Sequence, residues 1–242
     1  MNITAIIQAR MGSTRLPGKV MKQLMDRTVL GHVITRCQAI PIISKVVVAT
    51  TTLDEDQEIC EEAMKYGVSV YRGSKDNVLS RYYEAATIEQ SDVIVRITSD
   101  CPLIDPKISE DVINSFLHND YDYVSSGLSN TFPRGLDTEV FTYKALQEAY
   151  NRATKEYEFE HVTPYIYQHR DKFKVATYKN STDQSQYRLT LDTEEDWELI
   201  FKIYNDVYTG NVFYWNDIFD LLVRKPELIK INAEVRQKLL GE

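Results

Sequence analysis

An apolar run near the start of the chain leads into a loop rich in glycine and cations, where residues 6–19 read IIQARMGSTRLPGK. The apolar run is typical of a buried strand. The glycines allow the backbone to bend closely around a ligand, as it does at phosphate sites. Arg10, Arg15 and Lys19 supply the positive charge that several phosphate groups require. The stretch therefore predicts a polyphosphate cradle at the end of the first strand.

Two familiar phosphate loops do not match this stretch. The dinucleotide fingerprint needs the pattern G-x-G-x-x-G, which the loop does not supply. A Walker loop needs four residues between its glycines, and Ser or Thr after its lysine. Here five residues separate Gly12 from Gly18, and Val20 follows the lysine. A surface loop with solvated charges is the alternative interpretation, but cations interleaved with glycines directly after a buried strand favour phosphate binding.

Composition and charge narrow the class of protein. With 242 residues, 43% of them hydrophobic and 26% charged, the chain is long enough for a large α/β domain. The net charge of −8 argues against a nucleic-acid partner. We see no signal peptide and no apolar run of about 18 residues, so we expect a cytoplasmic protein without a membrane segment. The three cysteines lack pair spacing, and the four histidines lack metal-ligand spacing.

Strands and helices alternate through the first half of the chain. We expect strands at 45–50, 68–71 and 92–98, and helices at 54–65, 77–89 and 106–118. Asp54 is the expected cap of the first of these helices, and Gly67 lies near its end. Such alternation predicts an α/β fold with a mostly parallel central sheet flanked by helices.

The second half of the chain is less regular. We expect extended segments at 123–125, 136–142, 174–178 and 186–191, and helices at 144–152, 158–168, 193–204 and 217–224. Thr193 is suited to cap its helix, with Asp196 three residues later as in a capping box. This half is a candidate for an acceptor site or a dimer interface.

Two acidic residues follow predicted strands. Asp100 lies two residues after the predicted strand 92–98, and Asp192 stands at the end of the predicted strand 186–191, directly after its last residue. Ligands of open α/β sheets bind beyond the carboxyl ends of the strands, so both carboxylates are expected at one rim with the cation-rich loop. Polyphosphate chemistry uses a divalent cation with oxygen ligands, which favours a metal site. The alternative role of Asp100 is that of a turn residue, and the alternative role of Asp192 is that of a charge at a helix start. A helix-start charge is also the only role expected of Asp196. A third acidic pattern, Asp120-Tyr121-Asp122, favours a turn.

Several motifs in this order resemble the sugar-acid cytidylyltransferases, which include the CMP-Kdo and CMP-sialic acid synthetases. The likeness is closer to the spore coat polysaccharide biosynthesis protein F branch. The matching segments are 9–19 (ARMGSTRLPGK), 72–82 (RGSKDNVLSRY), 133–140 (PRGLDTEV), 160–165 (EHVTPY) and the segment around Asp192. The order of these motifs is far more specific than any one of them.

The resemblance implies a glycosyltransferase-A-like nucleotidyltransferase fold in a single domain. Residues 1–120 would form the nucleotide-binding half, 121–205 the acceptor or dimerisation half, and 206–242 a C-terminal helical extension. The nucleotide-binding residues implied are Ala9, Arg10, Gly12, Ser13, Arg15, Lys19, Asp76 and Arg81. Of these, Lys19 and Arg10 would act in catalysis, while Asp100 and Asp192 would hold Mg²⁺.

The resemblance also implies a reaction, in which CTP or another nucleoside triphosphate donates a nucleotidyl group to a sugar acid or sugar phosphate. Pyrophosphate is released, the product serves polysaccharide or glycan biosynthesis, and the enzyme is a homodimer. The candidate acceptor-binding residues are Arg134, Asp137, Glu139 and His161, with loop structure and a buried polar network as the alternative. Two other functions stay open: a glycosyltransferase that uses a nucleotide-sugar donor, and a catalytically silent nucleotide-binding protein.

Overall fold

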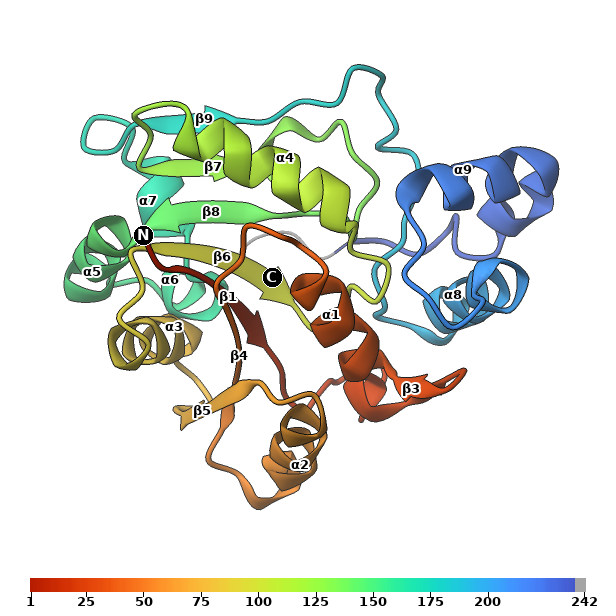
Figure 1. Ribbon diagram of the computed structural model, residues 1–242, viewed down its shortest axis with the longest axis horizontal. Helices are drawn as coiled ribbons and strands as arrows, with labels where there is room; N and C mark the ends of the chain where they lie inside the picture. The colour runs from red at the N-terminus through yellow and green to blue at the C-terminus, as the bar shows by residue number, and fades with distance from the viewer. Residues whose placement is uncertain (238–242) are drawn as a thin grey trace.

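Seven strands form the central sheet of the computed structural model, which describes residues 1–237. They are β1 (Ile3–Gln8), β4 (Lys45–Thr51), β5 (Ser69–Gly73), β6 (Val93–Thr98), β7 (Tyr123–Ser125), β8 (Glu139–Thr142) and β9 (Val175–Thr177). Their order across the sheet is β5-β4-β1-β6-β8-β7-β9 (Figure 1). Only β8 runs antiparallel to its neighbours β6 and β7, so the expected mostly parallel sheet is confirmed.

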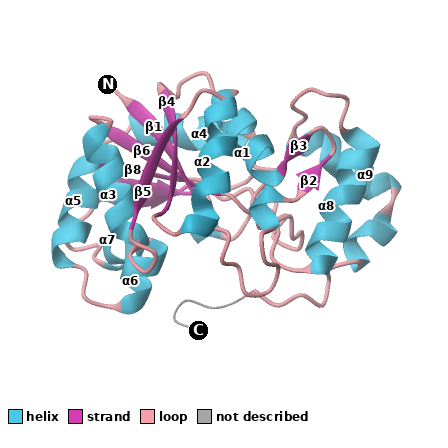
Figure 2. Cartoon of the chain, turned by 90° about the horizontal axis from the view of Figure 1, so that it is seen from below, coloured by secondary structure: helices cyan, strands magenta, loops and turns pink. Residues whose placement is uncertain are grey.

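Helices cover both faces of the sheet (Figure 2). One face carries α1 (Val29–Gln38), α2 (Gln57–Lys65) and α4 (Pro106–Leu117), and the other carries α3 (Val78–Ile88), α5 (Tyr143–Arg152), α6 (Glu156–His161) and α7 (Pro164–Gln168). Side chains alternate between the faces along a strand, so Ala5 and Ile7 of β1 pack into the first core and Ile6 into the second. Both faces of the parallel strands are therefore apolar, which explains the continuous hydrophobic runs in the sequence.

A third apolar cluster lies at one end of the molecule. It is built by α8 (Glu194–Val207) and α9 (Trp215–Arg224), next to the short hairpin β2 (Gln23–Leu24) and β3 (Arg27–Thr28) (Figure 2). Leu16 from the cation-rich loop and Leu191 from the segment before α8 are both buried in this cluster. The third cluster therefore anchors two segments that carry predicted site residues.

Two helix boundaries differ from those expected. Residues 54–56 form a 3-10 turn, η2 (Asp54–Asp56), and the N-cap of α2 is Asp56 rather than Asp54. The helix expected at 158–168 is interrupted between α6 and α7, where Val162 has a φ of 71°. Pro164 follows, and proline cannot donate the amide hydrogen bond of a continuous helix.

The strand expected at 186–191 is wrong, because this segment has no partner strand. It meets a loop instead, in a single isolated bridge between Arg134 and Arg188. Two backbone hydrogen bonds make the contact, from Arg134 N to Tyr187 O at 2.9 Å and from Leu189 N to Arg134 O at 2.7 Å. The helix α1 and the hairpin β2–β3 had no counterpart in the expected elements.

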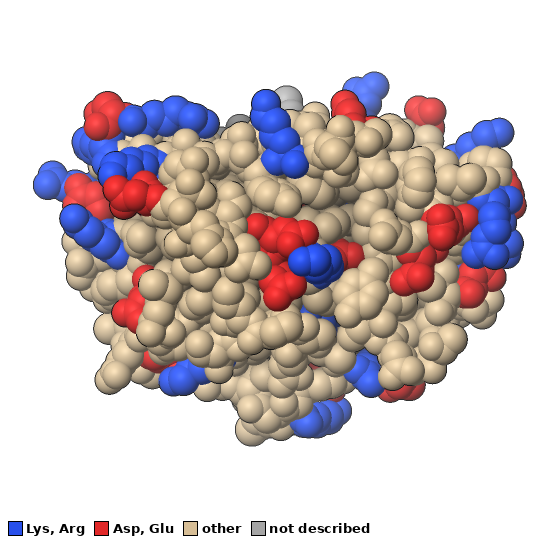
Figure 3. All heavy atoms as spheres, turned by 45° about the horizontal axis from the view of Figure 1, so that its top comes forward, with Lys and Arg blue, Asp and Glu red and all other residues tan. Residues whose placement is uncertain are grey.

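On the face shown in Figure 3, Lys and Arg side chains are interspersed with Asp and Glu rather than joined into one basic band. This pattern accords with the net charge of −8. None of the helices between residues 1 and 237 combines the length and the apolar composition that crossing a bilayer requires.

Candidate functional site

The cation-rich loop begins where β1 ends and closes on itself. The amide of Gly18 donates to the carbonyl oxygen of Met11 at 3.1 Å, and Gly18 adopts a φ of 65° that favours glycine. The buried carboxylate of Asp56 accepts the Met11 amide at 2.7 Å and fixes the loop to the start of α2. Asp56 is a residue that the sequence did not single out, because it reads as one more acidic helix-start residue.

The loop exposes some of its expected ligand-binding residues and buries others. Arg10, Gly12 and Arg15 are exposed, Ser13 is partly buried, and Ala9 is buried beneath them. Lys19 is buried as the first residue of the 3-10 turn η1 (Lys19–Met21). The loop therefore presents Arg10 to solvent, whereas Arg15 pairs with Asp192 Oδ2 at 3.0 Å and Lys19 points into the protein.

The Lys19 ammonium lies between the two predicted metal-binding carboxylates. It donates to Asp100 Oδ2 at 2.9 Å and to Asp192 Oδ1 at 2.8 Å, and also to the carbonyl oxygen of Leu191 at 2.7 Å. Burial alone would raise the pKa of Asp100, but Lys19 and neighbouring hydrogen bonds lower it to about 2. Burial likewise opposes the charge on Lys19, yet the two carboxylates raise its pKa. Lys19 and Asp100 are therefore both charged at neutral pH.

Backbone contacts bring the two carboxylates together across 92 positions of sequence. The amide of Leu191 donates to the carbonyl oxygen of Asp100 at 2.8 Å. On its other side the same segment lies against Gly135, where an added Cβ would come within 2.6 Å of the backbone of Leu189 and Thr190. The segment before α8 is thus held between the β6–α4 loop and the loop that contains Gly135.

The two carboxylates fit a divalent cation. Their oxygens converge on one position, since both lie within 3 Å of the same nitrogen atom. Magnesium is typically held by one or two carboxylates, with phosphate oxygens and water completing its shell. Among the described residues, no group of three or more His, Cys, Asp or Glu side chains is placed to hold a metal. A bound phosphate would thus have to supply the remaining ligands.

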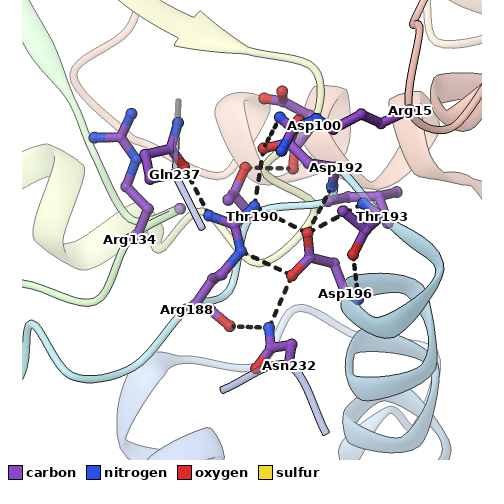
Figure 4. A network of polar contacts seen from close by, with 12 residues as sticks. Arg15, Asp100, Arg134, Arg188, Thr190, Asp192, Thr193, Asp196, Asn232 and Gln237 are labelled. Atoms are coloured by element: carbon purple, nitrogen blue, oxygen red, sulfur yellow. Dashed lines mark hydrogen bonds and ion pairs between the residues drawn. The ribbon is translucent and has the colours of Figure 1, made fainter. Parts of the chain in front are cut away.

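A second polar network lies behind Asp192 (Figure 4). Arg188 contacts Asp192 Oδ2 at 3.0 Å, and its Nε and Nη2 atoms donate to the buried carboxylate of Asp196. Asn232 donates to Asp196 Oδ1 at 2.8 Å. The expectation that Asp196 is only a helix-start charge is therefore wrong. Asp196 forms a capping box with Thr193 at the start of α8, and it also holds the Arg188 guanidinium beside Asp192. The sequence showed no sign of this network, because Arg188 lies outside any described helix, and its spacing of four residues from Asp192 indicates a contact only within a helix.

Asp76 lies in the loop between β5 and α3, and Arg81 lies in the first turn of α3. Asp76 is exposed, whereas Arg81 is buried and donates to the carbonyl oxygens of Ser74 and Lys75 at 2.6 and 3.3 Å. Arg81 therefore holds the loop that carries Asp76. Burial lowers the pKa of Arg81, and the nearby Arg10 adds to this effect.

The expected acceptor residues lie around a partly buried ion pair that the sequence did not reveal. Arg96 donates to Glu139 Oε2 at 2.7 Å, and Glu139 Oε1 accepts from the hydroxyl groups of Tyr123 and Thr163. Burial lowers the pKa of His161, which lies close enough to feel the charges of this pair. The sequence did not reveal this ion pair because Arg96 and Glu139 become neighbours only through the pairing register of β6 and β8.

The other two acceptor candidates form a looser pair. Arg134 is exposed, and its Nε atom lies 3.6 Å from Asp137 Oδ2. Asp137 also accepts the amide of Gly135 at 3.2 Å, and burial raises its pKa. Arg134 is therefore free to turn toward a ligand, while Asp137 supports the loop.

Two other features lie apart from this site. Asp120 and Asp122 both contact Lys174, so the Asp-Tyr-Asp pattern forms a turn against β9 rather than a metal site. A cavity of about 810 Å³ opens between α4, the segment after β9 and the start of α9, with Phe132, Tyr178 and Trp215 among its lining residues. Its lining includes none of the expected site residues.

A family model described as cytidylyltransferase matches residues 4–221. The chain belongs to the cytidylyltransferase family. It is 32% identical to the spore coat polysaccharide biosynthesis protein SpsF of Bacillus subtilis, over 93% of this chain and 96% of that protein. The expected family and branch are thereby confirmed, and with them the expectation of a nucleotidyltransferase enzyme.

Solved structures of cytidylyltransferases share the fold. A cytidylyltransferase from Leptospira borgpetersenii superposes with a TM-score of 0.91 at 38% identity, covering 99% of both chains. A CMP:2-keto-3-deoxy-manno-octonic acid synthetase complexed with CTP has a TM-score of 0.66 at 16% identity, over 85% of this chain and 99% of that one. The nucleotidyltransferase fold expected from the sequence is confirmed.

Proposed function

We propose that this cytidylyltransferase moves a cytidylyl group from CTP to a sugar acid or sugar phosphate and releases pyrophosphate, for surface polysaccharide or glycan biosynthesis. The observation that carries the proposal is the position of Lys19 between Asp100 and Asp192, directly below the exposed cations of the same loop. The likeness to a synthetase complexed with CTP supports the choice of nucleotide. The likeness to SpsF supports the choice of pathway class.

The chain's own residues serve mainly to position charge. Arg10, Arg15 and Lys19 would bind the triphosphate, with the loop glycines letting its oxygens approach the backbone. An acceptor oxygen attacks the α-phosphorus in line, the new P–O bond forms, and the bond to the β-phosphate breaks with its electron pair on pyrophosphate. Lys19 and the two arginines would stabilise the negative charge that develops on the leaving group.

Asp100 and Asp192 would hold Mg²⁺ in this proposal. The ion supplies Lewis-acid stabilisation of the phosphate oxygens when it is bound. Lys19 and neighbouring hydrogen bonds lower the pKa of Asp100 to about 2 against the effect of burial, so its carboxylate is charged at physiological pH. A sugar phosphate acceptor arrives as an anion and needs no general base.

The acceptor would lie between the Gly135 loop and the segment around His161. Arg134 would provide an exposed cation for an acceptor carboxylate or phosphate, and Asp137, Glu139 and His161 would orient hydroxyl groups. The lowered pKa of His161 keeps its imidazole neutral, so it acts as a hydrogen-bonding group rather than a charge.

One assay tests the proposal. The protein is incubated with Mg²⁺, each of the four nucleoside triphosphates and pooled sugar acids or sugar phosphates, while pyrophosphate is measured and products are identified by mass. We expect pyrophosphate with CTP and one acceptor class, and a product heavier by a cytidylyl group. Release of a nucleoside diphosphate or monophosphate from a nucleotide-sugar donor would indicate a glycosyltransferase instead. Binding of nucleotide without turnover over the whole panel would indicate a silent binding protein.

The homodimer also belongs to this proposal. The Tyr83 ring stacks on the ring of Tyr150 with centroids 4.2 Å apart, and its centroid lies 5.8 Å from that of Tyr143. This partly exposed aromatic surface on α3 and α5 is a suitable interface. Sedimentation velocity of the wild type and of Tyr83→Asp tests it: we expect a dimer that the substitution dissociates.

A further inference from the structure

Asp192 is surrounded by three cationic side chains. Its Oδ1 atom accepts a hydrogen bond from Lys19 at 2.8 Å, and its Oδ2 atom lies 3.0 Å from both Arg15 and Arg188. Asp100 contacts the same Lys19 ammonium at 2.9 Å. The oxygens that would face a metal ion are therefore already occupied by the protein's own cations.

These cations are held in different ways. Arg188 is fixed by two hydrogen bonds of 2.9 Å to the buried carboxylate of Asp196. Lys19 and Arg15 belong to the loop that would bind the triphosphate, and Arg15 is exposed. Hence Lys19 and Arg15 can exchange the carboxylates for phosphate oxygens, whereas Arg188 stays in place.

The charge balance disfavours a metal ion on its own. Three positive side chains meet three negative ones here, counting the Asp196 carboxylate that binds Arg188, so the cluster carries no net charge. A lone divalent cation would make it net positive and would meet the Lys19 ammonium at close range, where like charges repel strongly. A triphosphate carries enough negative charge to reverse the balance and to offer Lys19 an alternative partner.

We propose that Lys19 keeps divalent cations off Asp100 and Asp192 until the triphosphate arrives, because its ammonium occupies the position that the metal would take. The substrate of the site is then the metal–triphosphate complex, and Lys19 moves from the carboxylates to the phosphates as this complex enters. The inference rests on the proposed function for the identity of the anion. It adds an order of binding in which free metal does not precede nucleotide.

Binding of Mn²⁺ in the absence of nucleotide tests the inference. Free Mn²⁺ is measured by its EPR signal during titration of the wild type, Lys19→Met and Lys22→Met. Lys22 is a matched control, because it lies three residues further along and contacts Glu194 at 3.7 Å, outside the pair of carboxylates. We expect Lys19→Met to bind Mn²⁺ at least about tenfold more tightly than the wild type, since it removes the only ammonium that lies between the Asp100 and Asp192 carboxylates among the described residues. Lys22→Met should match the wild type.

A double variant identifies the bound site. In Lys19→Met/Asp192→Asn the gain in Mn²⁺ affinity should disappear, because one of the two carboxylates is lost. The inference is overturned if the wild type binds Mn²⁺ as tightly as Lys19→Met without nucleotide, or if the gain survives in the double variant. Should Lys19→Met fail to fold by circular dichroism, Lys19→Gln takes its place, and tight binding by the wild type alone still overturns the inference.

The result is independent of turnover. If the protein is inactive with every triphosphate but shows the Lys19-dependent change in Mn²⁺ affinity, the proposed reaction is overturned and the proposed role of Lys19 in excluding metal stands. If the enzyme is active but the wild type binds free Mn²⁺ tightly, the proposed reaction stands and the proposed role of Lys19 in excluding metal is overturned.

Discussion

Asp196 binds Arg188 through two parallel hydrogen bonds of 2.9 Å, from Nε to Oδ1 and from Nη2 to Oδ2. The Asp196 carboxylate is completely buried, and it also accepts the backbone amides of Asp192 and Thr193 at 2.9 and 3.1 Å. One side chain in the first turn of α8 thus positions the backbone of Asp192 and the guanidinium beside it.

Replacing Asp196 should destabilise the protein strongly. Asp196→Ala removes both 2.9 Å hydrogen bonds to Arg188 and leaves the amides of Asp192 and Thr193 without their acceptor, so we expect the free energy of unfolding to fall by about 3–5 kcal/mol. Glu198→Ala is the control on the same helix, because Glu198 and Lys202 form an exposed pair worth about 1 kcal/mol or less. Urea denaturation measures both, and equal midpoints for the two variants would contradict the role of Asp196.

Lys19 should matter for turnover more than for folding. For Lys19→Ala we expect a native circular dichroism spectrum and a loss of about two to three orders of magnitude in the rate of pyrophosphate release, as for other electrostatic contacts at reacting groups. Lys22→Ala, on the same segment but outside the carboxylate pair, should keep nearly the parental rate. Near-parental activity of Lys19→Ala would contradict the catalytic assignment.

Gly135 should tolerate no side chain. Its φ of 103° is unfavourable for other residues, and an added Cβ would lie 2.6 Å from the backbone of Leu189 and Thr190. Gly210 has a similar φ of 94° with nothing within 4 Å, so Gly210→Ala isolates the backbone cost of about 1–2 kcal/mol. We expect Gly135→Ala to cost about 1–3 kcal/mol more in thermal or urea unfolding. A smaller loss for Gly135→Ala than for Gly210→Ala would show that the two loops are not in close contact.

Arg134 should affect acceptor binding alone. Its side chain is about half exposed and makes only the 3.6 Å contact with Asp137, so Arg134→Ala should leave stability unchanged. We expect the KM for an anionic acceptor to rise about tenfold, the value of one charge-assisted hydrogen bond, while the KM for CTP stays constant. Arg152→Ala, an exposed arginine on α5, serves as the control. A rise in the KM for CTP would place Arg134 at the nucleotide instead.

His32 should make stability depend on pH. Burial and the nearby Arg36 and Arg27 lower its pKa to about 4, although a hydrogen bond of 2.7 Å to the carbonyl oxygen of Leu24 opposes this. The unfolded chain takes up a proton below its ordinary pKa of about 6.5, whereas the folded chain does so only near 4. Stability is therefore lost as the pH falls from about 6.5 to 4.

The variant His32→Gln removes this titration and keeps an amide that can donate to Leu24. Between pH 6.5 and 4 the wild type should lose about 2–3 kcal/mol more unfolding free energy than the variant. Parallel pH profiles for the two proteins would show that His32 does not titrate differently on folding.

Local patterns in the chain were enough to predict most of the first half of the fold. The apolar run in β1 and the capping box of Thr193 and Asp196 are both decided within a few residues, by burial on both faces of a strand and by unpaired amides at a helix start. The convergence of Asp100 and Asp192 near Lys19 was also expected, but for Asp192 the reason differs: a backbone hydrogen bond from Leu191 to Asp100 places it there, not the end of a sheet strand.

Long-range contacts decided what the sequence could not show. The segment 186–191 has the apolar character of a strand, yet it meets a loop at Arg134 instead of a strand. Arg96 and Glu139 become partners only through the register of β6 and β8. Asp196 becomes more than a helix cap only because Arg188 and Asn232 reach it from segments that precede and follow α8.

The sequence by itself therefore determined the family, the order of most elements and the central charged groups Lys19, Asp100 and Asp192, but not the Arg188–Asp196 pair beside them. Only the tertiary structure decided which charges face one another, above all that Lys19 lies between Asp100 and Asp192 rather than free in solvent. The physical reason is that strand and helix patterns come from interactions between near neighbours along the chain. The energy of an ion pair depends instead on the distance between the charges and on their burial. Lys19 is separated in sequence from Asp100 by 81 positions and from Asp192 by 173, so these pairs form only when the chain folds.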